Sequence, residues 1–248
     1  MIKTRAGTLQ RADALFRAGR LPEATAAYEA ALRDRPEDAA VLRRLGTLAL
    51  YENRAEDAVR YLGEALERSS TAARRGPASA TTRAQLGMAH YRLDRFPEAS
   101  REFAAAAGPL PLGPLGDLAG LGRHLAAFGD EPPYRIEGPP LTRLDFVVTD
   151  PLPVVELSVN GGCPALALID TGAAETVLDE AFAAAAGAKM VAAMKGEYAG
   201  RRRARTGLGV VGSVEAADLR VAHVPIHTLD LGEFRGFFGL DIKGIVGT

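Results

Sequence analysis

The first half of the sequence repeats itself with a period of 34 residues, and this feature restricts its fold more than any other. Six positions in one stretch are matched by residues of related size 34 places later. The first set is Ala12, Gly19, Ala24, Tyr28, Ala31 and Pro36, and the second is Gly46, Asn53, Ala58, Leu62, Ala65 and Ser70. A fixed period of this length is typical of stacked helical hairpins, in which neighbouring repeats bury a continuous apolar core.

A third copy follows after an offset of 41 residues. Its members are Leu86, Gly87, Phe96, Ala99, Phe103 and Ala106. The larger offset is explained by a Gly/Pro-containing insertion, 74–80, which we expect to form a loop between the second and third repeats. Each repeat is predicted to split into two helices near Gly19, Asn53 and Asp94, where the chain folds back on itself.

Residues 5–110 resemble the tetratricopeptide repeat family, with small residues where paired helices approach closely and larger ones between them. The resemblance implies an α-solenoid of about three repeats over 1–108, with a concave face on which a protein or peptide partner can bind. The sequence does not identify the residues of that groove. A purely structural or dimer-forming role stays open, as does an unrelated helical bundle.

A stretch rich in proline and glycine follows the repeats. Residues 109–140 are expected to form a linker with one short helix, 117–128, because proline at this density favours an extended connection. Beyond residue 141 the pattern changes to short β-branched runs bounded by turn residues. The sequence therefore predicts two domains, all-α followed by all-β.

The β-rich half is predicted to begin with a hairpin that ends in a carboxylate. Residues 154–159 alternate between faces, 160–162 form a turn, and 165–169 lead directly into Asp170-Thr171-Gly172. We expect Gly172 to allow a tight turn beside the Asp170 carboxylate. The Thr171 hydroxyl can then bond a symmetry-related loop. Two such aspartates held together share a proton, so that one acts as base toward water and the other as acid, with activity favoured at acidic pH.

The segment LIDTGAAETVLD, residues 168–179, resembles retropepsin-like (retroviral-type) aspartic proteases. The resemblance implies a single-lobe β-barrel over 141–248, with Asp170 as the catalytic residue and Thr171 and Gly172 as its supporting loop. It also implies substrate contacts from the residues that follow the loop and from a flap at 194–200. These substrate-binding candidates are Ala173, Ala174, Glu175, Gly196 and Tyr198.

A second motif, 244–247, resembles the strand that runs beside the active-site loop in this family. Because the family continues past this motif with a helix and further strands, the barrel is expected to be incomplete and the chain truncated at its C-terminus. Almost the whole chain resembles bacterial proteins that join tetratricopeptide repeats to such a domain.

One carboxylate loop per chain implies a homodimer. The other carboxylates considered as partners within the chain, Asp145, Asp150 and Asp241, have no Thr-Gly after them. The leading hypothesis is an aspartic endopeptidase that hydrolyses peptide bonds as a homodimer, with the repeats recruiting substrate or partner. The alternatives are a non-catalytic scaffold with a remnant protease domain, and a protease limited to self-processing or ligand binding.

Other residues that could carry chemistry have structural explanations. His223 and His227 flank a predicted strand, which separates their rings too far for one metal ion. The arginines at 201–205 are expected on a solvated hairpin face, with selection of acidic substrates as the minority alternative. Gly207, Gly209 and Gly212 are expected at turns and bulges.

The bulk composition narrows the partners and the compartment. A formal charge of -1 and a pI of about 6.5 favour neither nucleic acid nor a membrane surface. Cys163 is the only cysteine, so no disulfide can form within the chain. No metal or organic cofactor is expected. The N-terminus does not resemble a signal peptide, which predicts a cytoplasmic location, or a periplasmic one if the true start lies upstream.

Overall fold

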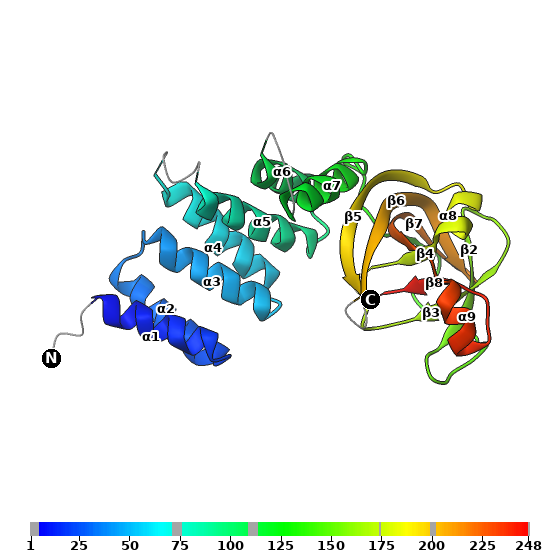
Figure 1. Cartoon of the computed structure of the whole chain (residues 1–248), viewed down its shortest axis with the longest axis horizontal. Coiled ribbons are helices and arrows are strands. Elements are labelled where there is room, and N and C mark those ends of the chain that lie inside the picture. The colour runs from blue at the N-terminus through cyan, green and yellow to red at the C-terminus, as the bar shows by residue number, and fades with distance from the viewer. Residues whose placement is uncertain (1–4, 71–75, 109–113, 174, 199–201, 248) are drawn as a thin grey trace. The chain divides into compact units, whose positions relative to one another are not determined.

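The computed structural model divides the chain into two compact units, Met1–Pro111 and Leu112–Thr248 (Figure 1). The structure describes residues 5–70, 76–108, 114–173, 175–198 and 202–247. The first unit is helical and the second is built around a curved sheet. The predicted order of an all-α and an all-β domain is confirmed.

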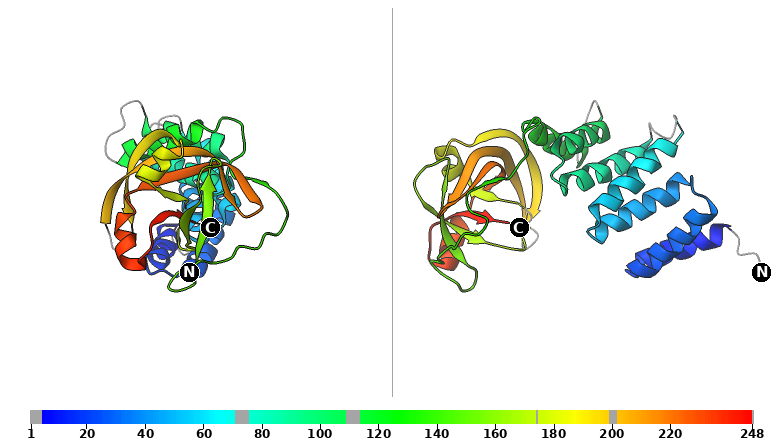
Figure 2. Two further views of the ribbon diagram at one scale, coloured as in Figure 1. Left: turned by 90° about the vertical axis from the view of Figure 1, so that its right-hand side faces the viewer. Right: turned by 180° about the vertical axis from the view of Figure 1, so that it is seen from behind.

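The N-terminal unit consists of antiparallel helical hairpins stacked in chain order, as the view from behind shows (Figure 2). Its helices pair within each repeat, and each repeat packs on the next. They are α1 (Arg5–Arg17), α2 (Leu21–Asp34), α3 (Ala39–Tyr51), α4 (Ala55–Arg68), α5 (Pro77–Tyr91) and α6 (Phe96–Ala107). The α-solenoid expected from the 34-residue period is confirmed.

The turn inside each hairpin has the same backbone conformation. Gly19, Asn53 and Asp94 occupy equivalent positions in the three repeats, with φ values of 72°, 55° and 54°. Glycine adopts this left-handed region freely, and asparagine and aspartate enter it more readily than other residues. The three turn positions predicted from the repeat are thus the places where the helices reverse.

The two helices of a repeat interlock through a glycine on the first helix and a large side chain on the second. A Cβ on Gly46 would lie 2.7 Å from Leu62 Cδ2, and one on Gly87 would lie 2.7 Å from Phe103 Cε1. Leu62 and Phe103 are fully buried. The paired helices approach so closely that only a hydrogen fits at these positions, which explains why small residues recur with the period.

The loop between the second and third repeats ends earlier in the sequence than predicted. Residues 71–75 lie outside the described residues, but Pro77 already opens α5. The expectation of a loop through residue 80 is wrong. Proline suits the first turn of a helix because its fixed φ is helical and the missing N–H has no partner there.

Much of the predicted linker is part of the C-terminal unit. Helix α7 (Pro114–Ala126) packs along strand β5 (Lys189–Tyr198), and strand β1 (Arg135–Glu137) pairs antiparallel with β7 (Leu219–Leu229). The short helix was expected at 117–128 and is confirmed with shifted ends. The prolines and glycines of 109–140 predicted a linker. Because α7 packs on β5 and β1 pairs with β7, most of this stretch is instead part of the folded C-terminal unit.

The sheet of the C-terminal unit closes on itself. Its order is β1-β7-β4-β8-β3-β2-β6-β5, and an additional β6–β7 pairing joins its two halves into a barrel. The remaining elements are β2 (Val154–Val159), β3 (Ala165–Ile169), β4 (Val177–Asp179), α8 (Glu180–Ala185), β6 (Arg202–Ala216), α9 (Gly232–Phe238) and β8 (Ile242–Val246). The predicted hairpin at 154–169 is confirmed as β2 and β3, which pair antiparallel.

The glycines at 207, 209 and 212 do not form turns. All three lie within β6, so the expectation of turn glycines is wrong. A Cβ on Gly207 would lie 2.6 Å from Met190 Cε, and one on Gly209 would lie 2.7 Å from Met190 Sδ. These glycines make room for a side chain of β5. The irregularity in register is on that partner strand, between Met190 and Ala192.

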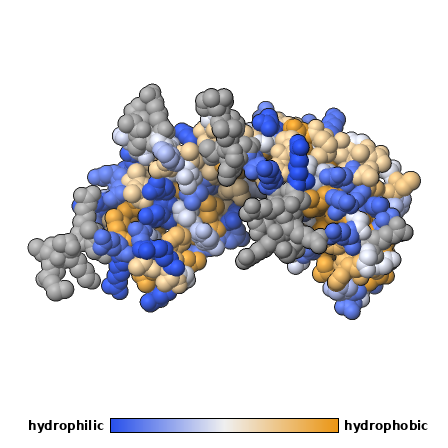
Figure 3. Space-filling model, viewed as in Figure 1, coloured by the Kyte–Doolittle hydropathy of each residue, from blue (hydrophilic) through white to orange (hydrophobic). Residues whose placement is uncertain are grey.

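Polar side chains cover much of the surface, with apolar ones scattered among them (Figure 3). The most exposed large apolar side chains are Tyr51, Ile136, Leu141 and Phe237. Among the described helices, none combines the length and the apolar character needed to cross a membrane.

Candidate active site

The Asp170 loop begins where two parallel strands end. Strand β3 pairs with β8, with Ile169 opposite Val246, and the Asp170 backbone N–H donates to the Val246 carbonyl at 3.0 Å. This bond fixes the backbone of Asp170 at the end of the ladder. The side chain is half-buried. The carboxylate is therefore presented by a rigid element but remains accessible.

Hydrogen bonds within the loop orient the carboxylate. The Gly172 backbone N–H donates to Asp170 Oδ1 at 2.8 Å, and the Ala173 N–H donates to the Asp170 carbonyl at 3.1 Å. A Cβ on Gly172 would lie 3.1 Å from Asp170 Oδ1, which is tighter than ordinary contacts. The expected role of Gly172, a tight turn beside the carboxylate, matches this geometry.

Strand β8 lies between β3 and β4, and it carries the second predicted motif past the loop. It pairs parallel with β3 and antiparallel with β4, with Gly244 opposite Ala167 on one side and Leu178 on the other. A Cβ on Gly247 would lie 2.8 Å from both the backbone nitrogen and the carbonyl oxygen of Glu175. The motif at 244–247 therefore packs directly against the loop. The sequence resemblance predicted a strand beside it.

The structure places the remaining loop candidates as follows. Thr171 and Gly172 are exposed, whereas Ala173 and Glu175 are half-buried. Ala174 lies outside the described residues. The loop thus brings Asp170, Thr171, Gly172, Ala173 and Glu175 together in a single turn of backbone, and their contacts with a substrate stay predictions.

The predicted flap is the end of a long hairpin. Strands β5 and β6 pair antiparallel up to their tip, with Gly196 opposite Ala204 and Tyr198 opposite Arg202. Residues 199–201 lie outside the described residues. The hairpin is confirmed as backbone structure, and the substrate contacts of Gly196 and Tyr198 stay predictions.

A structural carboxylate near the loop was missed by sequence reasoning. Asp179 is buried, and it accepts hydrogen bonds from the Phe182 N–H at 3.1 Å and the Leu231 N–H at 3.3 Å. Asp179 thereby caps α8 and ties it to the segment before α9. The signal was available, since an aspartate directly before a helical run is a strong N-cap candidate.

Helix α7 braces the flap hairpin from the outside. Asp117 Oδ1 accepts a hydrogen bond from the Lys195 N–H at 3.2 Å, one residue before Gly196. A Cβ on Gly120 would lie 3.2 Å from the Ala193 carbonyl, so the helix backbone comes close to β5. The flap strand therefore has a partner on α7 as well as on β6.

A buried histidine cluster joins α7 to the barrel. His124 is almost fully buried, and its ring lies 6.4 Å from the ring of His227 on β7. Burial lowers the pKa of His124 to about 4, with a smaller contribution from His227, and burial alone lowers the pKa of His227 to about 4. Both imidazoles are therefore neutral near pH 7.

The two histidines considered as metal ligands lie on a strand, as predicted. His223 faces Glu131, with Nδ1 and Oε2 3.6 Å apart, and its ring packs on Phe128. His227 instead faces His124. Phe128 lies between the two environments, since it packs on His223 and also on His124.

Comparison with known proteins agrees with this geometry. Residues 155–248 match the aspartyl protease family, and residues 5–48 match the tetratricopeptide repeat family. No curated protein matches the chain.

Solved structures with helical repeats also match. The structure called MamA MSR-1 is 23% identical, covers 50% of this chain and 66% of its own, and has a TM-score of 0.42. The second TPR of Spaghetti (RPAP3), bound to an HSP90 peptide, is 17% identical, covers 41% and 88%, and has a TM-score of 0.37. This chain therefore spans just under two thirds of the length of the MamA MSR-1 structure.

The family matches fall on the segments where the period and the Asp-Thr-Gly loop were found. The chain thus joins tetratricopeptide repeats to a domain of the aspartyl protease family.

Proposed function

We propose that the chain is an aspartic endopeptidase that hydrolyses peptide bonds as a homodimer. The observation that carries the proposal is the construction of the Asp170 loop. Its carboxylate accepts a backbone hydrogen bond at 2.8 Å and its backbone is fixed to β8. A carboxylate held this rigidly and left accessible suits a reaction that depends on positioning.

The second carboxylate comes from another copy of the chain. Each chain has one Asp-Thr-Gly segment, and the exposed Thr171 hydroxyl is available to bond the equivalent loop of the partner. Two carboxylates in hydrogen-bond reach cannot both ionise cheaply, so they hold one proton between them.

The reaction follows from that shared proton. The ionised carboxylate removes a proton from a water molecule, whose oxygen attacks the peptide carbonyl carbon, while the protonated carboxylate gives its proton to the carbonyl oxygen. The carboxyl group that took the proton from water then gives it to the amine nitrogen as the C–N bond breaks, and the other carboxylate takes back a proton from a hydroxyl of the intermediate. The products are a carboxylic acid and an amine.

The substrate lies between the loop and the flap in this proposal. Backbone of Ala173, Ala174 and Glu175 contacts one side of an extended peptide, and the hairpin tip with Gly196 and Tyr198 closes over the other. Closure excludes water other than the attacking one. The brace from Asp117 to the Lys195 N–H holds the base of the flap in place.

The test is cleavage of a mixed-peptide library from about pH 4 to 7 by the chain and by Asp170→Asn. We expect acid-favoured cleavage that Asp170→Asn abolishes. The matched control is Asp145→Asn, because Asp145 is almost fully exposed and pairs with the equally exposed Arg143 at 3.9 Å. Cleavage that survives Asp170→Asn would contradict the proposal.

Mixing the chain with Asp170→Asn tests the homodimer. If each active site needs two intact chains, an equimolar mixture that has exchanged subunits retains about a quarter of the activity, whereas independent chains retain about half. Retention of half would show that a single chain carries its own site.

A second candidate function is partner binding by the repeats without catalysis. It is favoured by a hollow on the N-terminal unit, lined by residues of α3 and α5. A chain that binds peptides and fails to cleave any of them at every pH, while remaining folded, would support this function over proteolysis.

A further inference from the structure

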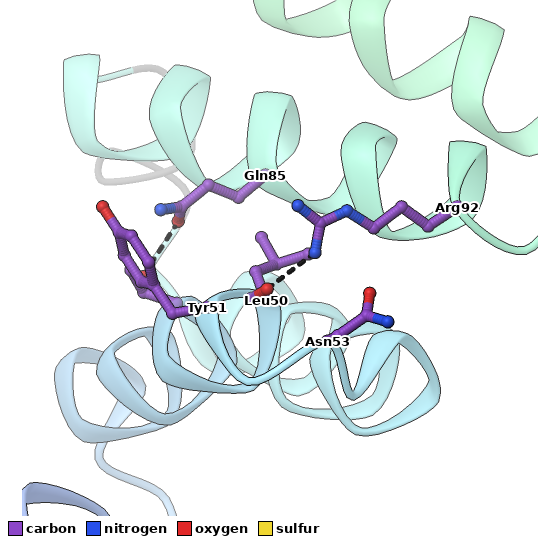
Figure 4. Close-up of a pocket in the computed structure, with 6 residues that line it drawn as sticks. Leu50, Tyr51, Asn53, Gln85 and Arg92 are labelled. Atoms are coloured by element: carbon purple, nitrogen blue, oxygen red, sulfur yellow. Dashed lines mark hydrogen bonds between the residues drawn. The ribbon is translucent and has the colours of Figure 1, made fainter. Parts of the chain in front are cut away.

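The hollow on the repeat unit lies between the first helices of two successive repeats. Its volume is about 390 Å³, which falls in the usual range for ligand pockets. Figure 4 shows its lining. The residues are Thr47, Leu50 and Tyr51 of α3, Asn53 of the following turn, Gln85 of α5, and Arg92 just after α5.

Arg92 gives the hollow its charge. One of its guanidinium nitrogens donates to the Leu50 carbonyl at 2.6 Å, which fixes the side chain across the gap between α3 and α5 (Figure 4). Within the described part of the chain no carboxylate forms an ion pair with Arg92, and the lining includes no acidic residue. The hollow therefore presents a positioned cation without a counter-charge.

Tyr51 provides an apolar surface in the lining of the same hollow. Its side chain is 69% exposed, and its ring rests edge-on against Phe16 with centroids 5.6 Å apart. Exposed aromatic rings next to arginine are typical of the residues that contribute most to protein interfaces. The contact with Phe16 holds the ring in place, so little conformational freedom is lost when it is covered.

The remaining polar groups include both donors and acceptors. The Thr47 hydroxyl donates to the Arg43 carbonyl at 2.9 Å, and its oxygen lies 3.2 Å from the side-chain amide of Gln85. The Gln85 amide, with one donor and one acceptor group, lies in the lining of the hollow (Figure 4). Asn53 presents an exposed amide at the rim. A peptide backbone requires both donors and acceptors. A polyanion such as nucleic acid requires a series of cations, and the lining contains a single one.

We propose that this hollow binds an extended peptide segment that carries an acidic side chain for Arg92 and an apolar side chain for Tyr51. The proposal rests on the partner-binding role of the repeats and specifies its residues and its ligand. The guanidinium binds the carboxylate, the tyrosine ring covers the apolar side chain, and the amides of Asn53 and Gln85 bond the peptide backbone.

The test selects peptides from a displayed random heptapeptide library on the full chain carrying Asp170→Asn, so that no cleavage interferes. We expect enrichment of sequences with Asp or Glu near an apolar residue. The enriched peptide and its Asp-to-Asn or Glu-to-Gln counterpart are then compared by fluorescence anisotropy. The acidic form should bind at least about tenfold more tightly.

Three variants assign the binding to this hollow. Arg92→Gln should remove the preference for the acidic form, and Tyr51→Ala should weaken both forms. Arg101→Gln is the matched control, since Arg101 lies exposed on α6 beside Glu98. Gln85→Glu leaves Arg92 in place and keeps a side-chain oxygen near Thr47, but it adds a negative charge to the hollow. It should therefore reduce binding of the acidic form. This test holds even if Arg92→Gln destabilises the repeats.

Several outcomes overturn the proposal. One is no enrichment at all, and another is enrichment that Arg92→Gln and Gln85→Glu leave unchanged. A third is binding of a single-stranded oligonucleotide in preference to every peptide. Binding of peptides independent of Arg92 would leave the repeats as a binding module but exclude this hollow. None of these outcomes depends on whether the Asp170 loop cleaves peptides.

Discussion

The two units of the chain differ in how far apart in sequence their contacts lie. In the repeat unit each helix packs on the next one or two along the chain, and the same glycine-to-large-residue contact recurs at Gly46 with Leu62 and at Gly87 with Phe103. In the barrel unit, β3 pairs with β8, whose residues follow more than seventy positions later. A stack held together by local contacts produces a periodic sequence pattern. Strand pairings between distant residues leave no such pattern, because they depend on many segments at once.

The difference extends to the treatment of polar groups. The repeat unit has charged side chains in exposed pairs, such as Arg20 with Glu23. The barrel unit buries two neutral imidazoles against each other. We therefore expect the two units to respond differently to acid, to backbone crowding and to turn substitutions.

Lowering the pH should produce the largest difference in stability between the two units. An unfolded imidazole has a pKa of about 6.5, and the folded values for His124 and His227 are about 4. Between pH 4 and pH 6.5 the unfolded chain binds more protons than the folded chain. The stabilisation is therefore complete above pH 6.5 and is lost as the pH falls toward 4. At about pH 4.5 we expect the barrel unit to be destabilised by about 5 kcal/mol for the pair.

Hydrogen exchange measured by mass spectrometry at about pH 7 and pH 4.5 resolves the units, after correction for the intrinsic exchange rate at each pH. The double variant His124→Leu/His227→Leu should flatten the pH dependence of the barrel unit. Equal acid sensitivity in the double variant would show that other groups control it. In the proposed protease, the same lability would restrict cleavage to mildly acidic pH, although a shared proton favours acid.

Crowding the backbone beneath the Asp170 loop should have the next largest effect. In Gly247→Ala the new methyl group lies 2.8 Å from backbone atoms of Glu175. We expect a loss of about 3 kcal/mol in the barrel unit, because the obstacle is backbone and cannot rotate away, together with a large loss of cleavage. Urea unfolding monitored separately in the two units should show the repeat unit unchanged. An unchanged barrel would mean that β8 does not support the loop.

Substitution by alanine should change the stability of the repeat unit in opposite directions at two of its glycines. Gly46→Ala places a methyl group 2.7 Å from Leu62 Cδ2 and should cost about 2 kcal/mol. Gly63→Ala has nothing within 4 Å and should stabilise helix α4 by about 0.7 kcal/mol. Thermal unfolding of the two variants side by side measures the difference. Similar effects at both sites would contradict the interlocking contact.

The smallest predicted effect is at a turn. Asp94 has φ of 54° between α5 and α6. Asp94→Ala should be less stable than Asp94→Gly by about 1 kcal/mol, because alanine resists the left-handed conformation that glycine adopts freely. Comparing the two substitutions cancels the loss of the carboxylate. A more stable alanine variant would show that the turn has relaxed.

The sequence was informative where a local rule determines the structure. The period predicted the positions of the three turns, and alternation with a turn signal predicted the hairpin at 154–169 with its bounds. The Asp170 loop and the supporting motif at 244–247 were predicted from a resemblance. The geometry agrees with both.

The failures concern contacts between distant segments. The packing of α7 on β5 and the pairing of β1 with β7 cannot be inferred from the composition of 109–140, which indicates only a break in helical periodicity. The glycines of β6 were predicted at turns and bulges. The space that Met190 requires at Gly207 and Gly209 could not be foreseen, because Met190 lies on another strand. Asp179 was overlooked because its second partner, the Leu231 N–H, is 52 residues away.

The position of β8 between β3 and β4 also has a consequence for biosynthesis. A chain leaves the ribosome from its N-terminus, so the repeats can fold while the barrel is still being made. The Asp170 loop is synthesised early in the barrel, but the Val246 carbonyl that fixes its backbone arrives only after α9. Until then the carboxylate has no fixed geometry. In the proposed protease, the order of synthesis would delay completion of the Asp170 loop until β8 has been made.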